Sequence, residues 1–266
     1  MTAINPARLR IQSVGLSEKY SDPEAFVREL HDVLDFYAVR VRKNKITQTP
    51  LLLQYHQVAP PVLRAIEAEL KDPINTQPSR GILLIDALWE EKWVETRTLA
   101  VSLLGELPPI NPDSVFKRLK SWLSDSKSDT IRSLLPTRGL SRLAEENPTL
   151  VLEFFQELLI SPSKDNCQAV LFGIIPFAEG EDFENLPLLY RLLARILLVD
   201  EIGLIKEILA VLKILIQRSE QESLYFLEKQ LSTASKPRIL QVIRQILPSF
   251  SPQNQASLRE VLNRYT

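Results

Sequence analysis

The sequence predicts an all-α protein built as a curved stack of antiparallel helix pairs, and three observations support this. Apolar residues recur at helical spacing in nearly every segment. Strand-like alternation is missing, and only 7 of the 266 residues are glycine, which disfavours folds that need many tight turns between strands. Prolines that follow capping residues divide the chain into about a dozen short helices.

Five dipeptides mark predicted helix starts, because each joins a capping side chain to a proline suited to the first helical position. They are Asp22-Pro23, Thr49-Pro50, Asn111-Pro112, Asn147-Pro148 and Ser251-Pro252. After the first of these starts, one helical face is apolar and carries Phe26, Leu30, Val33, Leu34 and Tyr37. ESLYFLEKQL and KPRILQVIRQIL repeat this pattern near the other end of the chain.

The spacing of the helix starts predicts repeats. The two Asn-Pro starts lie 36 positions apart (147 minus 111), close to the roughly 40-residue period of paired-helix repeats. Such a unit cannot bury its apolar face alone, so we expect a right-handed curved solenoid of HEAT- or ARM-like repeats with a concave ligand surface. We expect residues 1–20 to form a flexible N-terminal arm and residues 21–266 a single repeat domain. The acidic segment 179–187 is the best candidate for a seam, although helix pairs continue on both sides.

Composition argues against several classes of chemistry. Neither GxGxxG nor GxxxxGK[ST] occurs, so we expect no nucleotide cofactor. The single cysteine and two histidines show no CxxC or HExxH spacing, so we expect no metal. We expect Cys167, in an apolar run, to be buried, and His31 and His56 to face solvent or cap helices. A lone cysteine and the absence of an export signal or a charge-free apolar run predict a cytoplasmic protein without membrane contact.

Residues 83–108, LLIDALWEEKWVETRTLAVSLLGELP, contain Leu88-Trp89, an acidic turn and an E-x-R-x-x-A pattern that begins at Glu95. A helix with Phe116 and Trp122 follows, and SDTIRSLLP comes after it. This pattern resembles the HEAT-like-repeat DNA alkylation-repair glycosylases. Residues 146–172 resemble the next helix pair of that family, and the resemblance extends over about residues 80–175.

The resemblance implies cleavage of the bond between deoxyribose and an alkylated purine. A carboxylate stabilises the oxocarbenium-like transition state of such a reaction, and the matching position here is Asp129. The resemblance further implies that tryptophans and an arginine hold the sugar-phosphate and that full base extrusion is not required. Two positions depart from the pattern: Asp125 replaces an aromatic residue, for which Trp122 would have to substitute, and Cys167 replaces an arginine. Because cysteine cannot clamp a phosphate, we expect little or no excision activity.

The segment from Lys117 to Arg142 is strongly basic. Its cations are Lys117, Arg118, Lys120, Lys127, Arg132, Arg138 and Arg142, against only Asp125 and Asp129. Arg138 and Arg142 share a face if one helix persists through Gly139. The residues predicted to contact DNA are Trp122, Lys127, Arg132, Arg138 and Arg142, and RVRKNK at 40–45 is a second basic cluster.

A structural alternative stands beside each of these assignments. The basic face could be solvated and balanced by acids of other helices, since the net charge is −1. Asp129 could cap a helix, and Trp122 could pack in the core.

Three functions therefore remain open. The first is a DNA-binding member of the alkylation-repair family that contacts the phosphates of double-stranded DNA. The second is an active 3- or 7-alkylpurine DNA glycosylase that uses Asp129. The third is a non-enzymatic scaffold for a protein partner, because a helical solenoid by itself specifies no ligand.

Overall fold

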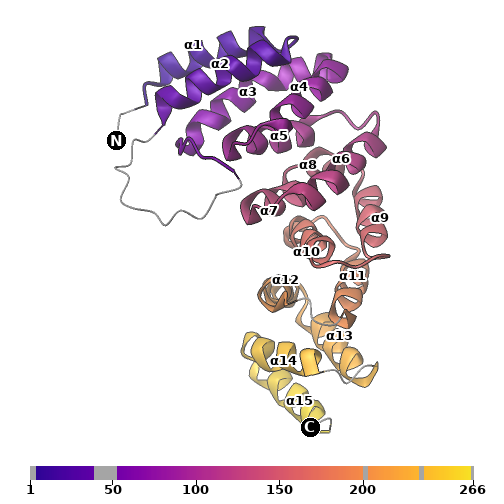
Figure 1. The fold of residues 1–266 in the computed structure, drawn as a ribbon. Coiled ribbons are helices and arrows are strands. Elements are labelled where there is room, and N and C mark those ends of the chain that lie inside the picture. Colours follow the sequence, from indigo (N-terminus) through magenta and orange to yellow (C-terminus); the bar gives the residue numbers. More distant parts are fainter. Residues whose placement is uncertain (1–3, 39–52, 200–202, 234–236, 265–266) are drawn as a thin grey trace. The chain divides into compact units, whose positions relative to one another are not determined.

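A computed structural model describes residues 4–38, 53–199, 203–233 and 237–264 (Figure 1). The protein is all-α, as predicted: no strand occurs in these ranges, and an isolated bridge joins Gln54 and Trp93. The chain divides into two compact units, Met1–Pro148 and Thr149–Thr266, where the sequence suggested one domain over 21–266. This boundary lies before the acidic segment 179–187 that was the candidate seam.

The first unit is built from two layers of helices. They are α1 (Pro6–Glu18), α2 (Pro23–Tyr37), α3 (Pro60–Thr76), α4 (Pro78–Glu90), α5 (Val94–Glu106), α6 (Pro112–Asp125), α7 (Asp129–Thr137) and α8 (Ser141–Glu146). Helices α1, α3, α5 and α7 stack in chain order as one layer, and α2 packs against α4 in the other. Helix α4 also contacts α3 and α5, so the two layers enclose a common core.

Residues 6–18 form α1 rather than part of a flexible arm. Asn5 caps the helix, since its Oδ1 accepts hydrogen bonds from the backbone N–H groups of Ala7 and Arg8 at 3.0 and 3.2 Å. Leu9, Ser13 and Leu16 are buried, and α1 packs on α3. Because a serine shares the buried face with two leucines, the sequence of this helix shows only weak hydrophobic periodicity.

Several helices begin where the Pro dipeptides predict. Asp22 and Asn111 cap α2 and α6, each accepting a hydrogen bond from the backbone N–H three residues further on, at 3.1 and 3.2 Å. Two later helices begin at Pro148 and Pro252, also as predicted. The predicted Thr49-Pro50 start lies outside the described residues.

The second unit repeats the layered packing. Its helices are α9 (Pro148–Leu158), α10 (Lys164–Glu179), α11 (Leu186–Leu198), α12 (Ile205–Arg218), α13 (Glu220–Thr233), α14 (Pro237–Ile246), the 3₁₀ helix η1 (Leu247–Ser249) and α15 (Pro252–Asn263). Helices α10, α12 and α14 stack in order, and α13 contacts α12, α14 and α15. Across the described parts of the chain, no helix is long and apolar enough to span a bilayer.

An arginine organises the loop after α10. The Arg218 guanidinium donates hydrogen bonds to the carbonyl oxygens of Ala178, Gly180, Glu181 and Phe183. The acidic segment is therefore tied to α12 through its backbone. The carbonyls at the end of α10 gain a cationic partner, which compensates for their lack of helical partners.

Candidate functional site

Two tryptophans stack at the ends of neighbouring helices in the first unit. The indole of Trp89, in the last turn of α4, lies against that of Trp122, in α6, with ring centroids 4.1 Å apart and an interplanar angle of 6°. Both residues are buried, at 4% and 5% exposure. This burial agrees with the structural alternative for Trp122, and Trp89 shares the same core position. Only a small edge of each ring is open to a ligand.

Arg97 lies over this pair. Its guanidinium carbon is 4.6 Å from the centroid of the Trp89 ring, within cation–π range. Its Nε donates to the carbonyl oxygen of Glu91 at 2.9 Å. Its Nη1 lies 3.3 Å from Oδ2 of Asp125, whose side chain is 58% exposed. Arg97 therefore links the start of α5 to the end of α6.

These residues surround an open pocket of about 390 Å³. Its lining consists of Trp89, Glu90, Arg97, Ser121, Trp122, Ser124 and Asp125. Two carboxylates and one guanidinium border two indole edges. Aromatic surface beside carboxylates suits a cationic ring or a sugar that develops positive charge, and the guanidinium offers donors to a phosphate.

Asp129 does not line this pocket. It is the first residue of α7 and is exposed. It also does not cap the helix, since Ser128 occupies the N-cap position and makes no side-chain capping hydrogen bond. The Asp129 carboxylate instead lies in the first turn, where the helix dipole favours negative charge. Asp125 is the aspartate beside the tryptophans, and its spacing of three from Trp122 is the sequence signal for a shared helical face.

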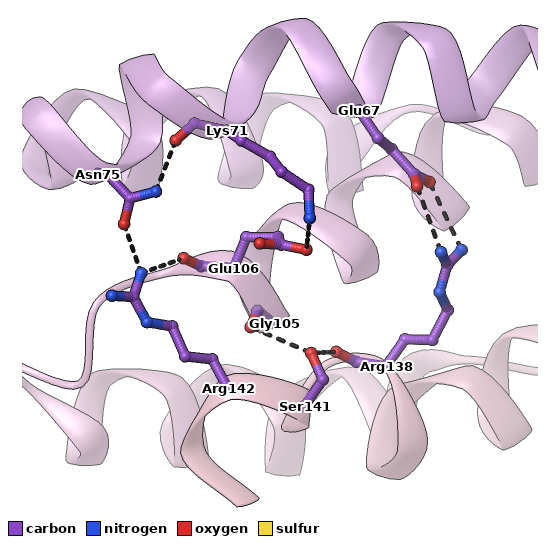
Figure 2. Close-up of polar contacts among 8 residues, drawn as sticks. All are labelled: Glu67, Lys71, Asn75, Gly105, Glu106, Arg138, Ser141 and Arg142. Atoms are coloured by element: carbon purple, nitrogen blue, oxygen red, sulfur yellow. Dashed lines mark hydrogen bonds and ion pairs between the residues drawn. The ribbon is translucent and has the colours of Figure 1, made fainter. Parts of the chain in front are cut away.

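The two arginines that share a predicted face both contact α3 (Figure 2). Arg138 donates to the two carboxylate oxygens of Glu67 at 3.2 and 3.5 Å, and the Glu67 side chain is only 12% exposed. Arg142 donates to Asn75 Oδ1, to the carbonyl oxygen of Glu106 at 3.0 Å and to Glu146 at 2.7 Å. These guanidinium groups therefore already have protein partners.

The single helix through Gly139 does not form. Helix α7 ends at Thr137 and α8 begins at Ser141, so the chain turns between them. At the end of this turn, the Oγ of Ser141 donates to the carbonyl oxygens of Arg138 at 3.0 Å and Gly105 at 3.1 Å. The two arginines face α3 because of this turn rather than because of helical periodicity.

The remaining predicted cations are placed differently from one another. Lys127 is exposed between α6 and α7. The Nε of Arg132 donates to the carbonyl oxygen of Ser126 at 2.8 Å, at the end of α6. Arg118 binds both carboxylate oxygens of Asp86 at 2.7 and 2.6 Å, and this hydrogen bonding raises the pKa of Arg118. The 40–45 cluster lies outside the described residues.

Cys167 and His56 are both buried. For Cys167 this confirms the prediction, and burial raises the pKa of its thiol to about 11, so the side chain remains a neutral thiol. For His56, which was expected to face solvent or cap a helix, the solvent-facing alternative is wrong. Its backbone N–H donates to Oε2 of Glu95 at 3.1 Å, and its ring stacks on Trp93 with centroids 3.8 Å apart.

A family model described as DNA alkylation repair enzyme matches residues 53–195. The match includes every residue that lines the pocket and extends beyond the 80–175 range of the resemblance. Comparisons with curated proteins and with solved structures gave no match.

Proposed function

Because the chain belongs to the DNA alkylation repair enzyme family, we propose that it binds double-stranded DNA at the Trp89–Trp122 pocket, with little or no base excision. One observation carries this proposal: two stacked indoles, a guanidinium and a carboxylate meet in one open pocket within the family region. A guanidinium donates hydrogen bonds to a phosphate, and aromatic edges and carboxylates attract a sugar or base that carries positive charge.

We further propose that the helix pairs are HEAT-like repeats of a right-handed solenoid. In support, one layer of the first unit stacks α1, α3, α5 and α7, and one layer of the second stacks α10, α12 and α14. Alternate helices of successive pairs stack in this way in repeat proteins, where each pair contacts mainly its neighbours.

Within the pocket, each group has a distinct chemical role. The indole edges would contact a sugar or an alkylated base, whose positive charge is attracted to aromatic and carboxylate groups. Arg97 would donate to a phosphate oxygen. Asp125 would stabilise positive charge at the sugar, but its contact with Arg97 at 3.3 Å offsets much of its field. This pairing is the reason to expect weak excision or none.

The electrostatic part of binding is modest. Binding becomes salt-sensitive in proportion to the number of phosphates that cations neutralise. Three of the seven cations between Lys117 and Arg142 already contact carboxylates: Arg118 contacts Asp86, Arg138 contacts Glu67 and Arg142 contacts Glu146. We therefore expect a shallower salt dependence than seven free cations would give.

The test combines DNA binding with base release. Wild type, Asp125→Asn and Asp129→Asn are titrated against duplex DNA at low salt, and release of 7-methylguanine from methylated DNA is measured. Both aspartates are exposed and close in sequence, so each variant is the matched control of the other. We expect all three proteins to bind, and any release to fall in Asp125→Asn only. A loss confined to Asp129→Asn would instead support the glycosylase that uses Asp129.

The scaffold function is a second candidate, and the ion pairing favours it. Arg97, Arg118, Arg138 and Arg142 pair with carboxylates of the same chain, and the net charge is −1. Both features reduce the electrostatic attraction for DNA. Absence of duplex binding at low salt would refute the DNA proposal. A protein partner recovered after nuclease treatment would then support the scaffold.

A further inference from the structure

The two histidines of the chain contact each other, although they are 25 positions apart. Nδ1 of His31, in α2, lies 3.1 Å from Nε2 of His56. A carboxylate lies at each outer end. Nδ1 of His56 is 2.8 Å from Oδ1 of Asp35, and Nε2 of His31 is 3.2 Å from Oε2 of Glu91. The four side chains thus form a continuous row with three contacts of hydrogen-bond length.

Counting protons shows what this row requires. An ionised carboxylate only accepts hydrogen bonds, and a neutral imidazole carries a single N–H. If both rings are neutral, each uses its one proton on its carboxylate. Two nitrogen lone pairs then face each other at 3.1 Å, which is repulsive. One additional proton between the rings turns this contact into a hydrogen bond.

We propose that His31 and His56 share this third proton, so that the pair is an imidazole–imidazolium unit between Asp35 and Glu91. This arrangement satisfies all three contacts and places one positive charge between two negative ones. The His56 side chain is only 2% exposed, so water does not replace the missing donor. The Trp93 ring, stacked on His56 at 3.8 Å with an angle of 19°, presents the aromatic face that a cation prefers.

The charged groups around the pair are consistent with this state. From α5, the Glu95 carboxylate accepts the backbone N–H groups of His56 and Gln57 at 3.1 and 2.8 Å, which adds negative charge beside the buried ring. On α2 itself, Arg28 and Asp32 flank His31 in sequence but line the groove between α2 and α1.

The shared proton also bears on the candidate site, and this step rests on the proposed function. The Glu91 carboxylate lies 3.2 Å from Nε2 of His31. The backbone carbonyl oxygen of Glu91 accepts a hydrogen bond from Nε of Arg97 at 2.9 Å. Arg97 in turn reaches Trp89 and Asp125. His31 is therefore a positioning residue for the arginine of the pocket. Loss of the third proton would keep the His31–Glu91 hydrogen bond but remove the positive charge that strengthens it.

NMR of the full chain with ¹⁵N-labelled histidine tests the proposal. We expect a strongly downfield N–H proton that is correlated with nitrogen atoms of both rings. The Arg97 Nε–H resonance should shift when this signal disappears at higher pH. Absence of such a proton at every pH at which the chain is folded would overturn the proposal.

Two variants separate the shared proton from the fold. His31→Gln keeps a donor and an acceptor but cannot carry the extra proton, so the downfield proton should disappear and the Arg97 resonance should lose its pH dependence. Asp32→Asn, which alters the α1–α2 groove only, should leave the downfield proton unchanged. If His31→Gln does not fold, the spectra of the wild type alone decide. None of these measurements uses DNA, so failure of the DNA proposal would leave the shared proton to be judged independently.

Discussion

Replacing Gly105 by alanine tests the close approach of α5 to the turn between α7 and α8. Gly105 lies near the end of α5, and a Cβ there would overlap the carbonyl oxygen of Arg138 and lie 2.8 Å from Oγ of Ser141. Because the clashing atom is a backbone oxygen rather than a flexible side chain, the turn between α7 and α8 would have to move. We estimate about 2 kcal/mol for overpacking, about 1 for the lost Ser141 hydrogen bond and about 1 regained in helix propensity. The expected net destabilisation is about 2 kcal/mol.

Urea unfolding followed by tryptophan fluorescence measures this effect, because Trp89, Trp93 and Trp122 all lie in the first unit. Gly15→Ala is the matched control. Gly15 is also helical, but an added Cβ would meet only Oε1 of Glu29 at 3.9 Å, so we expect a stabilisation of about 0.5–1 kcal/mol. If Gly105→Ala unfolds at the wild-type urea midpoint, the close approach of α5 to the α7–α8 turn is refuted.

Three further predictions concern other parts of the chain. Burial raises the pKa of Cys167 to about 11, so at mildly alkaline pH a thiol-alkylating reagent should modify the native protein at least ~100-fold more slowly than the urea-unfolded protein. Mass spectrometry measures the two rates, and equal rates would contradict the prediction. Arg218→Lys should lose hydrogen bonds to the carbonyl oxygens of residues 178–183 and destabilise the second unit by about 2 kcal/mol. Amide hydrogen exchange in the loop after α10 should become faster, and unaltered exchange would count against this prediction. In a DNA-binding assay, Glu67→Gln should release Arg138 from its ion pair and tighten binding. The slope of log affinity against log salt concentration should become steeper by about 1. An unchanged slope would show that Arg138 does not reach a phosphate.

The sequence predicted local features of the fold well. Helix starts at Asp22 and Asn111 follow from interactions within three residues, so the residue types and spacing suffice to identify them. The apolar face of α2 is likewise periodic and is buried as expected. Helix α1 was missed because Ser13 interrupts its apolar face, and its burial depends on contact with α3.

The candidate site depended on contacts between distant residues. Arg138 meets Glu67 across 71 positions and Arg97 meets Asp125 across 28. Such pairs depend on how far each helix is rotated about its axis and displaced along its neighbour, and hydrophobic periodicity fixes the buried face only coarsely. The basic segment consequently looked nearly free of acids in sequence. In space, Arg118, Arg138 and Arg142 meet acids from α4, α3 and α8.

The nearly parallel arrangement of Trp89 and Trp122 has a spectroscopic consequence. Two indole chromophores with centroids 4.1 Å apart couple their electronic transitions, so the near-ultraviolet circular dichroism of the protein should contain an exciton contribution from the pocket. A ligand that separates or tilts the rings would alter that signal without any attached dye, giving a direct optical view of occupancy.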